Sequence, residues 1–130
     1  MGLNERRKMK ELQDTTFPER SGEIEKICGK AIPYEVDWDS MADDAQALNF
    51  IDNISCHRIN MALRVICDDA IGKEAVRDGL TLIKLKNVQY TGAMAISFEK
   101  GVLEMHCAYA NGLTGAYSDS VIRELLMKKL

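Results

Sequence analysis

The longest helical pattern in the chain runs from Ser40 to about Ala70. Apolar residues recur there at steps of three and four, which is the spacing of one buried helix face. They are Ala45, Leu48, Ile51 (or Phe50), Ile54, Cys56, Ile59, Leu63, Ile66, Cys67 and Ala70. Ser40 suits an N-cap, Gly72 suits the end, and the weak helix formers Asp52 and Asn53 suit a bend between them. The pattern predicts one long core helix, or two in tandem.

A different pattern precedes this helix, because residues 32–38 alternate between apolar and polar positions. The apolar set is Ile32, Tyr34, Val36 and Trp38. Alternation of this kind is typical of a half-buried strand, and Pro33, which has no N–H, places that strand at a sheet edge. Trp38 at its end has two interpretations. It packs against the following helix, or it is an exposed binding hot spot.

Three further strands are predicted at 80–88, 93–99 and 102–109, with a turn at Thr91-Gly92. If Lys100 and Gly101 form a two-residue turn, the register of the last two strands follows. On one face it pairs Phe98 with Leu103, Ile96 with Met105 and Met94 with Cys107. On the other it pairs Ser97 with Glu104, Ala95 with His106 and Ala93 with Ala108. The three strands are expected to form an antiparallel meander.

The two ends of the chain carry weaker helical patterns. Residues 1–15 are locally basic, and they are expected to form an N-terminal arm that is compatible with a helix. A new helix is expected to begin at Thr16 and to end at Gly29. The final helix begins at Ser118. The fold class is therefore α+β, with N-terminal helices, an edge strand, a long central helix, a three-stranded antiparallel meander and a C-terminal helix. Residues 16–130 form a single domain in this interpretation.

Composition supports a globular chain and limits its partners. The 130 residues are 46% hydrophobic and 28% charged, as in ordinary globular domains. No apolar run is long enough for a membrane span and no signal-peptide pattern opens the chain, so a cytoplasmic protein without membrane contact is expected. The net charge of −3 argues against nucleic-acid binding, which needs a basic footprint on the phosphates.

An acidic stretch lies between Lys30 and Arg58, where lysine and arginine are absent. It is either a solvated face or a surface for a basic protein partner, since opposite fields speed encounter. The partner-binding candidates here are Asp37, Trp38, Asp39 and Asp43. Together with Asp44, these carboxylates lack the spacing of an EF-hand loop, so no metal is expected.

Both histidines sit beside a cysteine, as Cys56-His57 and His106-Cys107. Neighbours on a strand point to opposite faces and neighbours on a helix diverge by about 100°, so neither pair suits a single zinc ion. The four cysteines lack the short paired spacing of zinc sites and are expected to be free thiols. Cys56, Cys67 and Cys107 are expected to meet in one core as small hydrophobes. No cofactor is expected.

The outer face of the predicted hairpin carries unusually small residues, among them Ala95 and Ser97. A solvated sheet face normally carries larger polar side chains. Three kinds of cover are open: the N-terminal helices of the same chain, a second subunit, or a ligand in a shallow groove with His106 at its edge. Ala95 and Ser97 join the partner-binding candidates.

The chain has no nucleotide-binding, serine-hydrolase or metalloprotease motif. The leading hypothesis is a noncatalytic protein-interaction module of adaptor, chaperone-like or inhibitor type, which forms a homo-oligomer. The alternative is a small-ligand-binding protein or an enzyme with a site near the two histidines. Its candidate residues are His57, Arg58, Glu104 and His106.

Overall fold

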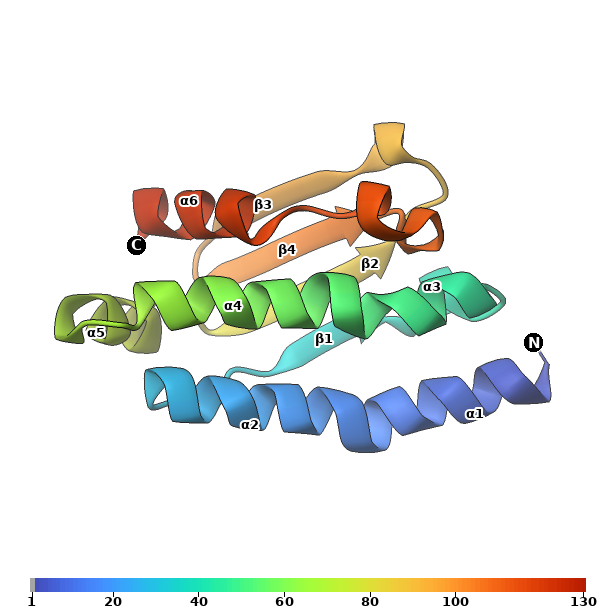
Figure 1. The fold of residues 1–130 in the computed structure, drawn as a ribbon, viewed down its shortest axis with the longest axis horizontal. Coiled ribbons are helices and arrows are strands. Elements are labelled where there is room, and N and C mark those ends of the chain that lie inside the picture. The colour runs from blue at the N-terminus through green and yellow to red at the C-terminus, as the bar shows by residue number, and fades with distance from the viewer. Residues whose placement is uncertain (1) are drawn as a thin grey trace.

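A four-stranded sheet forms one layer of the molecule, and the long helices form a second layer on one of its faces (Figure 1). This computed structural model describes residues 2–130. The strands are β1 (Tyr34–Asp37), β2 (Leu82–Asn87), β3 (Ala95–Glu99) and β4 (Val102–Cys107), in the spatial order β1-β2-β4-β3. The predicted α+β class is confirmed.

The predicted hairpin register is confirmed over the length of the β3–β4 ladder. Phe98 lies opposite Leu103, Ile96 opposite Met105, Ser97 opposite Glu104 and Ala95 opposite His106. Lys100 and Gly101 both have positive φ, at 51° and 82°, as a two-residue hairpin turn of this twist requires. The ladder begins at Ala95, so the two outermost expected pairs, at Met94 and Ala93, lie beyond it.

The expected meander is wrong, because β2 and β4 are parallel neighbours and β3 lies at the outer edge. The chain leaves β2, crosses the end of β4 through residues 88–94, and returns as the hairpin. Alternation decides which face of a strand is buried but not which strand lies beside it. The edge position predicted for β1 is confirmed, and β1 pairs with β2 in parallel.

The N-terminal arm and the second predicted helix form one continuous rod. It comprises α1 (Leu3–Glu11), a wider π turn (Leu12–Thr16) and α2 (Phe17–Cys28). The helix start expected at Thr16 is therefore wrong, although Gly29 ends α2 in the left-handed conformation as predicted. Pro18 offers no N–H to the preceding turn, and the wider turn lies immediately before it. Leu12 is 1% exposed and belongs to the core.

The central helix consists of α3 (Ala45–Ile51), a π turn (Asp52–Cys56) and α4 (His57–Ile66). The π turn lies where a bend was expected. The expected N-cap at Ser40 is wrong, since Asp44 caps the helix by accepting from the Ala47 N–H at 3.0 Å. Trp38–Met41 instead forms a short 3-10 turn.

The predicted end at Gly72 is also wrong. A separate helix, α5 (Ala70–Gly79), follows, and Gly72 lies in its first turn, where its N–H donates to Asp69 at 2.7 Å. The last helix, α6 (Asp119–Lys129), begins with Ser118 as its N-cap, as expected. In the described part of the chain, none of the helices has the length and apolarity needed to cross a membrane.

The core lies between the two layers. The sheet contributes Ile83, Leu85, Leu103 and Met105, and the central helix contributes Leu48, Ile59 and Leu63. Because the long helices all lie on this side, the described residues leave the other face of the sheet open (Figure 1). Cover of that face by the N-terminal helices, one of the three expectations, is therefore wrong.

Candidate functional site

The open sheet face carries two rows of side chains that run across the strands. One row is Glu35, Lys84, Glu104 and Ser97, and the other is Asp37, Lys86, His106 and Ala95. Opposite charges therefore alternate along the first row, from Glu35 through Lys84 to Glu104, and Asp37 lies opposite Lys86 in the second, an arrangement that stabilises neighbouring strands. Ala95 and Ser97 are exposed at the edge formed by β3.

A hollow of about 380 Å³ lies over these rows, with lysine, carboxylate and histidine side chains around it. His106 Nε2 lies 2.7 Å from Glu104 Oε2, within hydrogen-bond distance. The two candidates Glu104 and His106 are thus brought together. Both charge signs lie side by side along the rows, so the face presents no concentrated field of one sign to a ligand.

The other two ligand candidates lie elsewhere. His57 and Arg58 open α4 in the helix layer, where His57 is exposed and Arg58 Nη1 donates to the Tyr117 carbonyl at 3.0 Å. Glu104 and His106 point away from that layer. The four residues therefore do not converge on one site.

The acidic stretch is partly explained by local capping. Asp37 accepts from the Ser40 N–H at 3.3 Å, and Asp44 caps α3. Asp39 and Asp43 are exposed and border a hollow of about 370 Å³. Among the described residues, no three histidine, cysteine or acidic side chains are placed to share a metal ion.

Trp38 is half-buried and meets the ring of Phe17 edge-on, with ring centroids 5.5 Å apart. Phe17 also meets the Tyr34 ring at 5.4 Å. Trp38 therefore packs between the end of β1 and the N-terminal rod, a placement suited to fixing α2 on the sheet.

A partly buried polar network joins α2, the central helix and β1. Arg20 donates to both carboxylate oxygens of Asp52, at 2.7 and 3.1 Å, and to Glu23 at 3.0 Å. The buried Asn60 Nδ2 donates to Glu23 at 2.8 Å and to the Arg20 carbonyl at 3.2 Å, and Asn60 Oδ1 accepts from the Tyr34 hydroxyl at 2.9 Å. Burial opposes ionisation of Glu23, but the hydrogen bonds from Asn60 and Arg20 outweigh it and lower the pKa of that carboxyl.

This network was not foreseen from the sequence, although one signal was available. Asn60 lies four residues after Cys56 and three before Leu63, so a polar side chain occupies the apolar stripe of α4. Buried polar atoms need partners, and every buried side-chain nitrogen and oxygen atom of the described residues has one. The network is suited to fixing the helix layer on the sheet.

The cysteines lie in two separate parts of the molecule. Cys56 and Cys107 are buried, and burial raises the pKa of both thiols, which disfavours the thiolate that nucleophilic chemistry needs. Cys67 does not join them as expected. It lies at the end of α4 beside Cys28, with the two Sγ atoms 2.8 Å apart.

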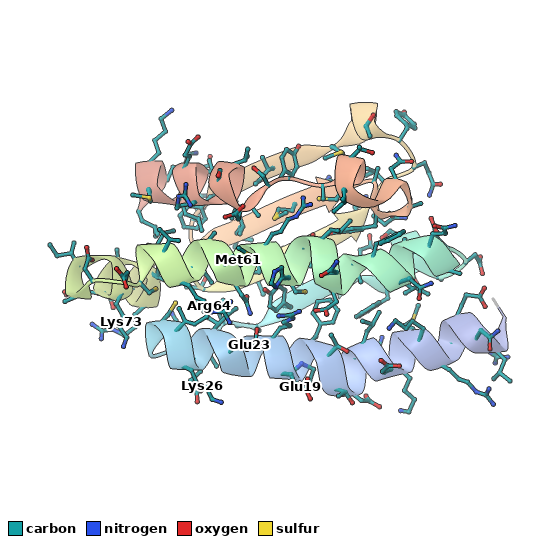
Figure 2. The ribbon with its side chains drawn as sticks, in the orientation of Figure 1. Glu19, Glu23, Lys26, Met61, Arg64 and Lys73 are labelled. Atoms are coloured by element: carbon teal, nitrogen blue, oxygen red, sulfur yellow. The ribbon has the colours of Figure 1, made fainter. Side chains whose placement is uncertain are left out.

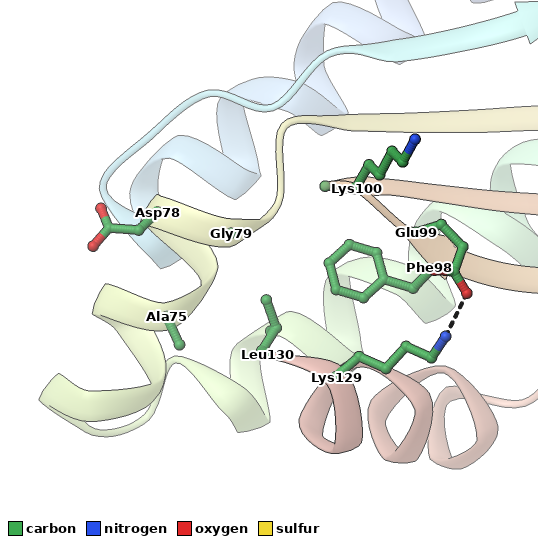
Figure 3. A pocket seen from close by; sticks show the side chains of 9 residues that line it. Ala75, Asp78, Gly79, Phe98, Glu99, Lys100, Lys129 and Leu130 are labelled. Carbon is green, nitrogen blue, oxygen red and sulfur yellow. Dashed lines mark hydrogen bonds and ion pairs between the residues drawn. The ribbon is translucent and has the colours of Figure 1, made fainter.

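A further hollow, of about 530 Å³, lies between the ends of α5 and α6 and the β3–β4 turn (Figure 3). At this hollow the Lys129 ammonium donates a hydrogen bond to the Glu99 carboxylate. That hydrogen bond lowers the pKa of the Glu99 carboxyl. Asp78 and Lys100 also lie on its border. Charges of both signs therefore surround this hollow as well.

The clearest exposed feature is an apolar surface on α4, α5 and α6, which we call the helical patch. Its members are Met61, Val65, Ile71, Val121 and Met127. They are five of the eight large hydrophobic side chains exposed among the described residues, so the exposure is concentrated on these helices. Val65, Ile71 and Met127 line one groove of about 330 Å³, and Val121 and Met127 line the hollow beside it. The two hollows share Met127, so four of the five members form one continuous surface, and Met61 lies one turn before Val65 on α4.

No family model, no curated protein and no solved structure matches this chain. Its function is therefore inferred from its own surfaces and contacts.

Proposed function

We propose that the protein is a noncatalytic protein-interaction module that binds a second copy of itself through the helical patch. The observation that carries this proposal is the contiguity of the patch. Ile71 is 82% exposed and Met127 is 62% exposed, yet both line the same groove. Single exposed hydrophobic residues are common, whereas a contiguous group marks an interaction surface.

The shape of the patch suits a helical partner. Met61 and Val65 lie one turn apart on α4, so they share a face, and α6 lies beside α4 (Figure 1). A groove between helices accepts the apolar face of another helix. The flexible Met127 side chain that lines the groove can adapt to the surface that it meets.

The charges around the patch favour a second copy as the partner. Asp69 borders the groove, and Glu124 and Lys128 border the adjoining hollow. A two-fold interface brings the same surface together from both subunits, so it must be complementary to itself. A border with both charge signs meets that condition, whereas a border of one sign would repel its copy.

An adaptor, chaperone-like or inhibitor role, in the cytoplasm, remains part of this proposal. The acidic stretch is a proposed second contact, for a basic protein. Reversing the charge of Asp39 and Asp43 should then weaken binding of a lysine-rich probe peptide, measured by fluorescence anisotropy. Unchanged binding would remove the acidic stretch from the proposal.

Charge introduced into the patch should prevent self-association. We expect Ile71→Glu and Met127→Glu each to raise the dimer dissociation constant at least about ten-fold, because burying an unpaired carboxylate opposes dimer formation. Sedimentation velocity over a concentration series measures this change. The matched control is Leu113→Glu, because Leu113 is 71% exposed but lies outside the patch.

Circular dichroism of each variant establishes that a change in mass does not reflect unfolding. Wild-type protein that stays monomeric at every concentration would contradict self-association. An equal loss of dimer in Leu113→Glu would contradict the assignment of the interface to the helical patch.

A further inference from the structure

Two of the four cysteines meet where two helices end. Cys28 is the last residue of α2, and Cys67 follows the last residue of α4. Their Sγ atoms are 2.8 Å apart, whereas a disulfide bond is about 2.05 Å long. A relative movement of about 0.8 Å would therefore bring the sulfurs to bonding distance.

Both cysteines of this pair lie at helix ends. Cys67 has already left the helical conformation, with φ −86° and ψ 12°, and Cys28 is followed by Gly29 in the left-handed region. Residues at helix ends lack part of the hydrogen bonding that holds a helix interior. A small shift here disturbs less structure than it would in the middle of either helix.

The surroundings of the pair distinguish it from the other thiols. Cys67 is half-buried and so reachable from solvent, whereas Cys28, Cys56 and Cys107 are buried. Lys73 of α5 lies near the pair, at the end of the helix layer (Figure 2). Its positive charge favours the thiolate of both Cys28 and Cys67, although burial has the larger effect and raises the pKa of each. The pair is therefore mainly protonated at neutral pH, and only its small thiolate fraction attacks an oxidant, so the oxidation is slow.

We propose that Cys28 and Cys67 form a redox modification site that hydrogen peroxide converts to a reversible disulfide. Cys67 reacts first, because it is the accessible thiol. Its sulfur attacks one peroxide oxygen, the O–O bond breaks, and the released hydroxide takes up the thiol proton to leave as water. Cys67 is then a sulfenic acid.

Cys28 completes the reaction as the resolving thiol. Its sulfur attacks the Cys67 sulfur, the S–S bond forms, and the sulfenic hydroxyl leaves as a second water with the Cys28 proton. Together the two thiols lose two electrons, and one hydrogen peroxide is reduced to two waters. The bond joins α2 to the end of α4 and restricts the unfolded chain, so the oxidised protein is more stable. This inference is independent of the proposed self-association.

The test uses the full chain, reduced and then freed of reductant, with equimolar hydrogen peroxide as the probe. The product is unfolded, alkylated and digested, and its peptides are identified by mass spectrometry. We expect one cross-linked peptide pair, containing Cys28 and Cys67, that dithiothreitol separates again. Cys56 and Cys107 should be fully alkylated and serve as internal controls. Four alkylated cysteines, a cross-link through Cys56 or Cys107, or oxidation of Cys67 to a sulfinic acid without a cross-link would each overturn the proposal.

A second measurement compares the urea midpoint before and after peroxide treatment. We expect the midpoint of the wild-type protein to rise on oxidation and to return with dithiothreitol, and that of Cys67→Ser to stay unchanged. An equal rise in Cys67→Ser would overturn the assignment of the pair. Peptide mapping of the wild-type chain decides the question even if the variant does not fold.

Discussion

Replacing Leu12 by alanine should lower the free energy of unfolding by about 3 kcal/mol. Leu12 is 1% exposed, and it lies in the π turn that joins α1 to α2. Truncation removes apolar contacts and leaves a cavity that the surrounding core fills only in part. Equilibrium unfolding in urea, followed by circular dichroism, measures the change.

The matched control is Leu3→Ala on the same rod. Leu3 is 54% exposed, so its truncation should change the free energy of unfolding by less than about 0.5 kcal/mol. Equal, small effects of the two substitutions would mean that the N-terminal rod is not docked on the core. The comparison separates an ordered part of the fold from a solvated arm.

Replacing Asn60 by leucine should lower the free energy of unfolding by a similar amount, about 3 kcal/mol. Leucine fills a similar space, so the effect comes from lost hydrogen bonds and not from a cavity. The Tyr34 hydroxyl would lose its Asn60 partner, and the Arg20 carbonyl and the Glu23 carboxylate would each lose one of their hydrogen bonds. A buried polar group without a partner destabilises the folded state by about 1–3 kcal/mol. Urea unfolding again supplies the measurement.

A double-mutant cycle with Tyr34→Phe tests the cause. When Asn60 is replaced by leucine, the Tyr34 hydroxyl has lost its hydrogen-bond partner, so removing that hydroxyl costs less stability than it does in the wild-type protein. The two changes together should then destabilise by about 1 kcal/mol less than the sum of the single changes. Additive effects would show that the Tyr34–Asn60 bond contributes little and that Asn60 acts through its other contacts.

The hairpin could be predicted in detail because two independent local signals agreed. Lys100-Gly101 suits a two-residue turn, and alternation on either side gave one register that keeps Phe98 and Leu103 on the buried face. The edge position of β1 followed from Pro33 for a similarly local reason. The strand order could not be predicted in this way, because parallel pairing of β2 with β4 depends on a crossing of the chain through residues 88–94.

Helix boundaries were less predictable because several residues offered the same capping chemistry. Ser40 and Asp44 are both good N-caps, and only the folded chain shows that Asp44 takes that role. Gly72 reads as a helix end, but Asp69 starts a new helix just before it. Ile71 lies in this second helix, where it is 82% exposed.

The contacts of most functional interest join distant parts of the chain. Arg20 meets Asp52, and Cys28 meets Cys67, although neither pairing has a local sequence signal. The helical patch could not be predicted from the sequence for another reason. An exposed methionine or isoleucine has the same residue type as a buried one, so only the packing of α4, α5 and α6 separates Met127 from core residues.

Methyl NMR of methionine-labelled protein tests the central claim most directly. The chain has seven methionines, and their positions supply both probe and control. Met61 and Met127 belong to the helical patch, whereas Met41 and Met105 are buried in the core. Dilution should shift the methyl signals of Met61 and Met127 with one common dissociation constant and leave those of Met41 and Met105 unchanged. Met61 and Met127 signals that stay constant over the whole concentration range would contradict self-association through the helical patch.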